Sequence, residues 1–504
     1  MFRRILIANR GEIALRVIRT AREMGIECVA VYSDADAGAL HTRMAHVAVP
    51  LGGAAPGESY LVMEKVLQAA KDTGAEAIHP GYGFLSENGE FAEAVKAAGM
   101  AWIGPPTGAI KAMGDKITCR QEMKAAGVVC VPGLDHPVAD ATEAVTAAES
   151  IGYPVALKAS AGGGGKGIRV VREPSEMESA FRTASGEALS AFGDGRLYLE
   201  RYLDHPRHVE IQVLCDNHGN AVHLFERECS IQRRHQKLLE ECPSVALDPA
   251  MRDAMGAMAL KAARHVDYEG VGTVEFLVSG GEFFFLEMNT RLQVEHPITE
   301  MTTGVDLVAE QLRVAAGEPL RFEQEDLKQT GHAIEVRVNA EDPYAGFLPS
   351  TGTLKNLRVP GGPWVRLDSA MHEGLEVGMA YDPMLAKIIV WGEDRDQAIA
   401  RMERAIAETN VGGVRTGLPA ALAVLGHEDF RAGNYDTHFL ESLTLEPPVE
   451  YDALVAAAAV LHRRYLAAQR AMSPHSSDRG GWRERSRRET GAYAQRLMER
   501  GGSQ

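Results

Sequence analysis

The sequence predicts an α/β protein in which an N-terminal doubly wound parallel sheet precedes largely antiparallel sheet and a second α/β unit. Three observations predict this fold class. The chain has 504 residues, more than one hydrophobic core normally serves, and about 150 residues is a common domain size. Strand and helix patterns alternate over about the first 110 residues, as in a parallel sheet with helices on both faces. From about Met113, long strand-like segments and hairpin signals take over.

The N-terminal region begins with a buried strand, RRILIAN. A helix is expected from Gly11 to Met24, with apolar residues at helical spacing, and Gly25 suits the position after its end. The segments ECVAVYS and AEAIHPG read as the following strands. No GxGxxG follows the first strand, so the usual dinucleotide fingerprint is missing.

The rest of the chain carries longer strands. YPVALKAS is followed by a glycine run, and HVEIQVLCD, AVHLFERE and the hairpin GTVEFLVSGGEFFFLEMN follow. Another α/β unit, with HAIEVRVNAED and MLAKIIVWG, is expected from about Gly331 to Glu446, and an Ala-rich helix from Tyr451 to Met472. The last residues have the composition of a disordered or partner-ordered tail.

The composition excludes several classes of function. A net charge of −16 and a pI of about 5.6 leave no electrostatic footprint for nucleic acid or an anionic membrane surface. Six scattered cysteines without a CxxC make a disulfide framework or a zinc site improbable. The N-terminus is not that of a signal peptide, and no apolar run is long enough to span a membrane. We therefore expect a cytoplasmic protein.

The hairpin carries two candidate metal ligands. If its turn centres on Gly281, Glu275 and Glu287 lie opposite each other and project from one face. Period-two alternation places Asn289 and Arg291 on that face if the strand continues. Opposed carboxylates need a cation or a shared proton, and carboxylate and amide oxygens suit Mg²⁺ or Mn²⁺. The alternative is a solvated strand face with Glu–Arg pairing.

Two further segments carry candidate anion-binding groups. The run SAGGGGKG, with Lys158 on the preceding strand, can bring bare backbone N–H groups close to phosphate; otherwise it is a flexible loop. Lys116 is a second candidate cation. The segment ECSIQRRHQKLLEE concentrates positive charge in an acidic protein, which indicates a local anion site unless it is simply a basic surface element.

Together these motifs resemble the biotin carboxylase members of the ATP-grasp superfamily. The resemblance rests on MGDK, KASAGGGGKG, ERYLDHPRHVEIQ, ECSIQRRHQK, GTVEF, FLEMNTRLQVEHPITE and EVRVNAED, in that order, and on ILIANRGEIALRVIRTARE and HPGYGFLSEN before them. It covers about residues 1–446. It implies a Rossmann-like N-terminal domain (1–113), an ATP-grasp domain (114–330) with a mobile lid at about 131–203, a C-terminal domain (331–446) and a tail (447–504).

The resemblance also implies residue roles in nucleotide and metal binding. ATP phosphates would be held by two lysines and covered by the glycine loop, the adenine would be contacted by Glu200 and Leu203, and the metal would be held by the hairpin. The nucleotide residues are Lys116, Lys158, Gly163, Gly164, Gly165, Glu200, Leu203, His208, Gln232 and His235. The metal residues are Glu275, Glu287 and Asn289.

The implied chemistry is ATP- and bicarbonate-dependent carboxylation of biotin. Bicarbonate would lie against Lys237, Arg291, Gln293 and the backbone of Val294, and Glu295 would remove its proton before it attacks the γ-phosphate. The resulting carboxyphosphate yields CO₂ and phosphate, and the phosphate is a plausible base for the ureido N–H of biotin. Arg337 would stabilise the biotin enolate.

The resemblance implies several partners. The sequence contains no MKM motif, so biotin is expected on a separate biotin carboxyl carrier protein, with a carboxyltransferase subunit elsewhere. The expected assembly is a homodimer or larger complex that performs the first half-reaction of an acetyl- or propionyl-CoA carboxylase. The alternative is the same subunit of a two-subunit pyruvate carboxylase. The tail has an apolar helix side and a basic end. Either the helix packs on the protein's own core and the basic end is solvated, or the tail is a docking segment for the carboxyltransferase.

Two other functions compete with this one. An amide ligase or a carbamoyl-phosphate-forming subunit of the same fold would keep the ATP machinery without needing RxQVEHP and the downstream EVR. A non-enzymatic nucleotide-binding scaffold would be favoured by loss of Glu295, Lys237 or Arg337. All three residues are present, which favours the enzyme.

Overall fold

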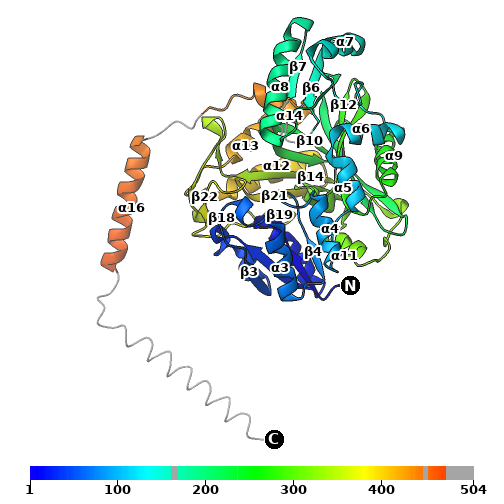
Figure 1. Cartoon of the computed structure of the whole chain (residues 1–504). Helices are drawn as coiled ribbons and strands as arrows, with labels where there is room; N and C mark the ends of the chain where they lie inside the picture. Colours follow the sequence, from blue (N-terminus) through cyan, green and yellow to red (C-terminus); the bar gives the residue numbers. More distant parts are fainter. Residues whose placement is uncertain (161–167, 235, 447–451, 473–504) are drawn as a thin grey trace. The chain divides into compact units, whose positions relative to one another are not determined.

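The structure is a computed structural model that describes residues 1–160, 168–234, 236–446 and 452–472. The chain divides into two compact units, Met1–Leu445 and Glu446–Gln504. The first unit contains all the sheets that the structure describes (Figure 1).

A five-stranded parallel sheet forms the N-terminal part of the first unit. Its order is β3-β2-β1-β4-β5. In β1, Ile5 and Ile7 pack with helix α1 in one hydrophobic cluster, whereas Leu6 packs with α3 and α4 in another. Helices therefore cover both faces, and the predicted doubly wound sheet is confirmed. The elements are β1 (Arg4–Ile7), α1 (Gly11–Glu23), β2 (Glu27–Tyr32), β3 (Val47–Pro50), α3 (Met63–Thr73), β4 (Ala77–His79), α4 (Gly89–Ala97) and β5 (Ala101–Trp102).

An eight-stranded antiparallel sheet forms the centre of the molecule. Its order is β13-β12-β9-β10-β11-β14-β21-β19, and β11 pairs with β14 so that Glu240 lies opposite Glu335. Strands from both sides of residue 330 thus share one sheet, while the predicted domain boundaries stay a prediction. The strands are β9 (Arg207–Cys215), β10 (Ala221–Arg233), β11 (Gln236–Cys242), β12 (Gly270–Ser279), β13 (Glu282–Asn289), β14 (His332–Asn339), β19 (Val365–Ser369) and β21 (Met384–Gly392).

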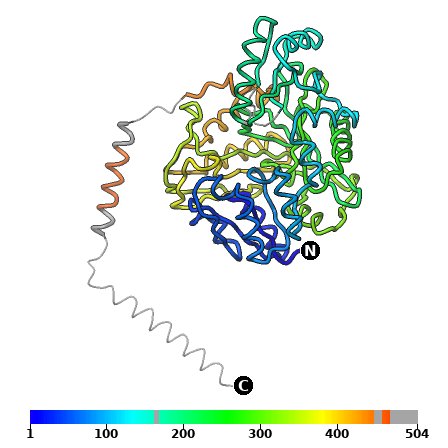
Figure 2. The backbone as a smooth tube through the Cα atoms, viewed as in Figure 1, coloured from blue at the N-terminus to red at the C-terminus, as the bar shows by residue number. Residues whose placement is uncertain are grey.

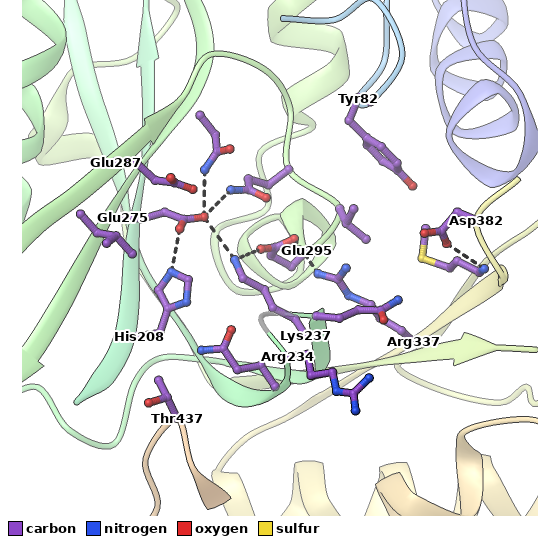
Figure 3. A pocket seen from close by; sticks show the side chains of 18 of the residues that line it. Tyr82, His208, Arg234, Lys237, Glu275, Glu287, Glu295, Arg337, Asp382 and Thr437 are labelled. Atoms are coloured by element: carbon purple, nitrogen blue, oxygen red, sulfur yellow. Dashed lines mark hydrogen bonds and ion pairs between the residues drawn. The ribbon is translucent and has the colours of Figure 1, made fainter. Parts of the chain in front are cut away.

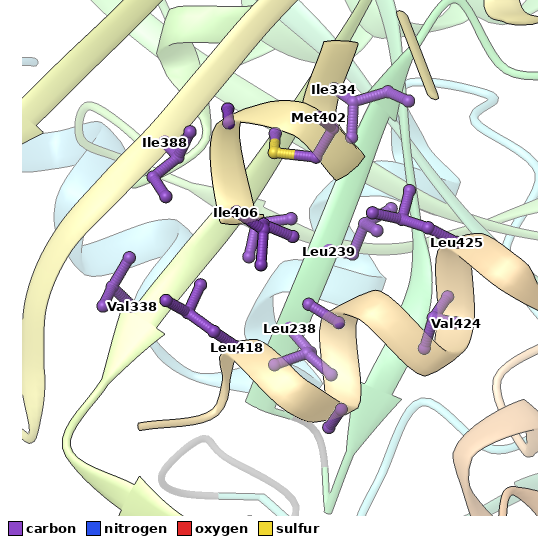
Figure 4. Packing of buried hydrophobic residues seen from close by; sticks show 14 of the residues in the cluster. Leu238, Leu239, Ile334, Val338, Ile388, Met402, Ile406, Leu418, Val424 and Leu425 are labelled. Atoms are coloured by element: carbon purple, nitrogen blue, oxygen red, sulfur yellow. The ribbon is translucent and has the colours of Figure 1, made fainter. Parts of the chain in front are cut away.

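Helices cover the central sheet and build its main core. In Figure 4, Met402 and Ile406 of α12 and Leu418 of α13 pack against side chains of β11, β14 and β21. Because these strands are held from behind, the side chains on their opposite face have fixed positions. Besides α7 and α8, which are described with the lobe below, the remaining helices of eight residues or more in this unit are α5 (Thr107–Gly114), α6 (Lys116–Ala125), α9 (Pro249–His265), α10 (His296–Thr303), α11 (Leu307–Ala315), α12 (Arg395–Glu408) and α13 (Leu418–Gly426).

A smaller lobe lies at the top of Figures 1 and 2 and corresponds to the predicted lid. Its antiparallel sheet has the order β7-β6-β8, and its own hydrophobic cluster joins the sheet to two helices. The elements are α7 (Ala141–Ile151), β6 (Val155–Ala159), β7 (Ile168–Val171), α8 (Met177–Phe192) and β8 (Leu197–Arg201). The segment after β8, residues 202–206, leads directly into β9 of the central sheet and is called the hinge segment below.

The second unit contains α16 (Asp452–Met472), as the Ala-rich pattern predicts. The basic residues expected to follow it lie outside the described residues. Within the described ranges, no helix has both the length and the apolar character that crossing a lipid bilayer requires.

Candidate active site

A cavity of about 1430 Å³ lies between the lobe, the central sheet and the loops of the parallel sheet. All the predicted site residues that the structure describes line it. They are Lys116, Lys158, Glu200, Leu203, His208, Gln232, Lys237, Glu275, Glu287, Asn289, Arg291, Gln293, Val294, Glu295 and Arg337. Gly163, Gly164, Gly165 and His235 lie outside the described residues. The sequence motifs, spread over more than 200 residues, therefore face one space (Figure 3).

The two hairpin carboxylates lie opposite each other, but not for the predicted reason. The turn is the pair Gly280–Gly281, both with positive φ, and near it Ser279 pairs with Glu282. That register alone would put Glu275 opposite Leu286. An irregularity after Glu275 adds a residue to β13 and restores the pairing of Glu275 with Glu287. The predicted turn centre was wrong, and the predicted opposition is confirmed.

Glu275 is held as a carboxylate by four donors. Its Oε1 accepts hydrogen bonds from Asn289 (2.8 Å) and Gln293 (2.9 Å), and its Oε2 from His208 Nε2 (2.8 Å). The Lys237 ammonium lies 3.4 Å from Oε1. Burial would raise the pKa of Glu275, but Lys237 and His208 hold it well below its usual range.

Glu287 and Glu200 each neutralise a lysine that faces the cavity. Lys116 Nζ, on the first residue of α6, lies 2.8 Å from Glu287 Oε2, and this contact lowers the pKa of Glu287. Lys158 of β6 contacts Glu200 of β8, whose other oxygen accepts from Arg120 (3.1 Å). Both lysines have carboxylate partners, and an incoming phosphate would compete for the same ammonium groups.

Glu295 lines the cavity between two cations. Its side chain is fully buried and contacts Lys237 through Oε1 and Arg337 through Oε2 (3.0 Å). Burial opposes ionisation, but these two cations lower the pKa of Glu295 well below its usual value. Arg337 also donates to Glu240 Oε1 (2.7 Å). Figure 3 shows Lys237 and Arg337 on either side of Glu295.

The segment between β13 and α10 holds the remaining predicted residues. Arg291 donates to Asn289 Oδ1 (2.7 Å) and to Glu87 (3.0 Å). β13 ends at Asn289, so the strand does not continue to Arg291 as the prediction of a shared strand face required, although the two side chains are in contact. The carbonyl of Val294 accepts from the buried Lys387 (2.7 Å), which fixes this backbone beside Glu295.

Sequence reasoning missed several charged residues that support the site. Glu210 accepts from Lys237 (2.7 Å) and from the fully buried Arg227 (2.6 Å). Its signal was present in the sequence, since His208 and Glu210 are two residues apart on one strand and therefore share a face. Glu240 carried no such signal, because its partner Arg337 is 97 residues away.

The carboxylates of the hairpin have the chemistry of a divalent-cation site. Glu275 and Glu287 present carboxylate oxygens from adjacent strands toward one cavity, and three cationic side chains, Lys237, His208 and Lys116, balance them. Two opposed carboxylates that need this much positive charge suit a hard cation with oxygen ligands. The Asn289 oxygen accepts from Arg291, so it becomes a ligand only when Arg291 turns away.

Three family models match most of the chain. The biotin carboxylase N-terminal domain matches residues 1–110, and the biotin carboxylase C-terminal domain matches residues 335–442. The ATP-binding domain of the carbamoyl-phosphate synthase L chain matches residues 115–323, between them.

Individual relatives are similar over nearly the same region. A pyruvate carboxylase subunit of Methanothermobacter thermautotrophicus is 54% identical over 441 residues, which are 88% of this chain and 90% of the relative. The propionyl-CoA carboxylase alpha chain of Ruegeria pomeroyi is 51% identical and covers 92% of this chain and 72% of its own length. A solved structure, the biotin carboxylase domain dimer of Hydrogenobacter thermophilus 2-oxoglutarate carboxylase with MgADP, ADP and bicarbonate, has a TM-score of 0.85 at 48% identity and covers 88% and 97%.

Proposed function

Since this chain belongs to the biotin carboxylase family and is an ATP-dependent ligase, we propose that it carboxylates biotin attached to a separate carrier protein. The observation that carries the proposal is the buried carboxylate of Glu295 between Lys237 and Arg337 in the lining of a large cavity. Burying each of these three charged groups costs free energy, because each must be desolvated. A non-enzymatic nucleotide-binding scaffold would gain nothing in return for that cost.

We propose that ATP binds by replacing the carboxylate partners of two lysines, because the cavity already contains paired charges before the nucleotide enters. Phosphate oxygens displace Glu287 from Lys116 and Glu200 from Lys158, so that each ammonium keeps a negative partner. Glu200 and Leu203 lie at or beside the hinge segment, where they contact the adenine. The glycines Gly163, Gly164 and Gly165, with His208, Gln232 and His235, complete the proposed nucleotide site.

The exchange leaves Glu287 free for a metal. Glu275 and Glu287, with Asn289, would hold Mg²⁺ or Mn²⁺, which would neutralise the phosphate charge during transfer. The solved relative with MgADP supports magnesium in such a site.

Bicarbonate is proposed to bind against Lys237, Arg291, Gln293 and the Val294 backbone. In the structure the low pKa of Glu295 reflects its two cations, and such a carboxylate is a weak base. A bound bicarbonate brings a second negative charge against Lys237, which also pairs with Glu295. Like charges raise the proton affinity of a carboxylate, so substrate binding itself makes Glu295 a better base.

Arg337 is proposed to act after carboxyphosphate has formed. Its guanidinium is fixed by Glu240 and Glu295 before biotin arrives, so little reorganisation is needed when negative charge develops on the ureido oxygen. A donor fixed in this way stabilises a transition state by about 3–4 kcal/mol.

Two measurements on the full chain test this function. ATP hydrolysis should depend on Mg²⁺, bicarbonate and biotin, with free biotin a poor substrate. The intact mass should show no covalent biotin. If ATP hydrolysis does not depend on biotin, the proposed function is wrong. If the intact mass is greater by one biotin, biotin is carried on this chain and not on a separate protein.

The complex that the enzyme serves is a further proposal. We favour an acyl-CoA carboxylase, because the match to the propionyl-CoA carboxylase alpha chain covers 92% of this chain, against 88% for the pyruvate carboxylase relative. That pyruvate carboxylase relative is nevertheless 54% identical and supports a two-subunit pyruvate carboxylase as the second candidate. Co-purification from the native host identifies the carboxyltransferase and decides between them.

Assembly and location follow from the same proposal. We propose a homodimer or larger complex, supported by the dimer of the solved relative, in the cytoplasm, where the six free cysteines stay reduced. Helix α16 exposes Val460, Leu461 and Leu466, and we propose that it docks to the carboxyltransferase. Truncation after Glu446 should leave free-biotin carboxylation within about threefold, since Met1–Leu445 is a compact unit, but should weaken co-elution. Full assembly without the tail would exclude the docking role.

A further inference from the structure

Three metal-ligating side chains meet beside the hinge segment. None of them belongs to the set proposed for ATP, bicarbonate and biotin, although His438 also lines the edge of the cavity. They are His205, in the segment between β8 and β9, and Asp436 and His438 near the end of the first unit. Their candidate ligand atoms all lie within 4.8 Å of one another. His205 Nδ1 is 2.7 Å from Asp436 Oδ2, and His438 Nδ1 is 3.6 Å from Asp436 Oδ1.

These separations suit a tetrahedral metal. With metal–ligand distances of about 2.0–2.1 Å, neighbouring ligand atoms lie about 3.3 Å apart. The two imidazoles lie 2.7 and 3.6 Å from the two different oxygens of Asp436. A turn of the Asp436 carboxylate that aims one oxygen at both rings, with a rotation of the exposed His205 side chain, would give the ligand set. The His205 side chain is 81% exposed, so a metal ion can enter from solvent and a water can take the fourth position.

The second nitrogen of His438 is already engaged. Its Nε2 lies 3.0 Å from the hydroxyl of Tyr202, whereas its Nδ1 has no hydrogen-bond partner within the described structure. In metal sites, a hydrogen bond to one ring nitrogen orients the histidine and leaves the other nitrogen for the metal. A histidine that merely formed a surface ion pair with Asp436 would not need this support.

From this convergence we propose that His205, Asp436 and His438 form a binding site for a divalent transition metal of the Zn²⁺ class. Two imidazoles and one carboxylate select Zn²⁺, Co²⁺ or Ni²⁺ over Mg²⁺, which prefers oxygen ligands alone. The site is therefore chemically distinct from the carboxylates of the cavity.

The position of the site gives the metal a mechanical consequence. His205 belongs to the hinge segment, whereas Asp436 and His438 belong to a segment already joined to it by one backbone hydrogen bond, from Thr437 N to Pro206 O (3.1 Å). Ligation adds a cross-link between the two segments. The hinge backbone over residues 202–206 then opens less often, which slows its amide hydrogen exchange.

The experiment uses the full chain with Co²⁺ as a visible probe and Zn²⁺ as competitor. Excess Mg²⁺ and ADP occupy the carboxylates of the cavity. The variants are His205→Ala, Asp436→Asn and Tyr202→Phe. The control is His265→Ala, because His265 pairs with one carboxylate, Glu122 (2.9 Å), and belongs to no three-ligand group among the described residues.

We expect a tetrahedral Co²⁺ absorption band that Zn²⁺ abolishes. The band should be lost in His205→Ala and Asp436→Asn and retained in His265→Ala. Tyr202→Phe should weaken the affinity by about 10-fold or more. Zn²⁺ should slow amide exchange at residues 202–205 in the unmodified chain and in His265→Ala but not in His205→Ala, while metal-free His205→Ala keeps full ATP hydrolysis as evidence of its fold. An unchanged Co²⁺ band in His205→Ala or Asp436→Asn would overturn the proposal.

Discussion

Replacement of Arg337 by alanine separates the catalytic and structural parts of the proposed mechanism. The guanidinium contacts Glu240 and Glu295, both fully buried. Its removal therefore has two consequences: the positive charge beside the biotin enolate is lost, and two buried carboxylates lose a partner.

The two consequences have different magnitudes and different readouts. Loss of a fixed donor should lower biotin carboxylation by about 10²–10³, or about 3–4 kcal/mol. Breaking a buried ion pair should lower the free energy of unfolding by about 3–5 kcal/mol. Nucleotide affinity should change little, because Lys116, Lys158 and the hairpin are not contacted by Arg337 in the described structure.

The matched control is the double variant Arg337→Ala/Glu240→Gln. It removes one of the two stranded carboxylates and should recover part of the unfolding free energy, measured by urea titration, without recovering carboxylation. Nucleotide affinity is measured by calorimetry, and carboxylation by ATP hydrolysis in the presence of free biotin. A parallel fall in ATP affinity, or recovery of carboxylation in the double variant, would refute the role of Arg337.

Three further substitutions test the charge network. Glu295→Gln should bind nucleotide but lose bicarbonate-dependent ATP hydrolysis, and substantial residual hydrolysis would assign the base to another group. Burial raises the pKa of Glu335 well above its usual range, so Glu335→Gln, which puts a neutral amide in place of the acid, should change the free energy of unfolding by less than about 1 kcal/mol; a large loss in urea titrations would mean that the native side chain is ionised. Burial opposes ionisation of Glu241, but His332 and Arg395 lower its pKa from 4.5 to about 2. The contribution of the ionised carboxylate to the free energy of unfolding is therefore present above pH 4.5 and is lost as the pH falls toward 2. Glu241→Gln should therefore lower the free energy of unfolding by about 3 kcal/mol at pH 7. The difference in stability between the variant and the unmodified chain should shrink on acidification, and a difference that does not change with pH would exclude this link to the pKa of Glu241.

The sequence was sufficient wherever the deciding contact was local. The N-terminal alternation of strand and helix predicted the parallel sheet because each element has its own hydrophobic period. The opposition of Glu275 and Glu287 could be predicted because both lie in one hairpin. Its detailed register could not, since the added residue near Leu286 depends on packing that the sequence does not display.

Contacts between distant strands were beyond sequence reasoning from spacing alone. Glu240 meets Arg337 only because β11 pairs with β14, and a segment of almost 90 residues separates the two strands. The predicted role of Arg337 came from a family resemblance, not from any local pattern. The cluster of His205, Asp436 and His438 has the same origin, since the chain brings its members together over about 230 residues.

The charge pairing of the cavity explains why so many titratable groups can be buried before any substrate binds. Three lysines of the cavity, Lys116, Lys158 and Lys237, each contact a carboxylate. In the proposed mechanism each of these carboxylates later binds another group or accepts a proton. Each substrate then replaces one partner of an existing pair, so the site is never left with an uncompensated buried charge, which would cost several kcal/mol. This arrangement requires the substrates to bind in a coupled manner. Displacement of Glu287 by phosphate prepares the metal ligands, and the metal in turn relieves the repulsion between Glu287 and Glu275. Since Glu275 shares Lys237 with Glu295, occupation of the nucleotide site also changes the charge around the proposed base.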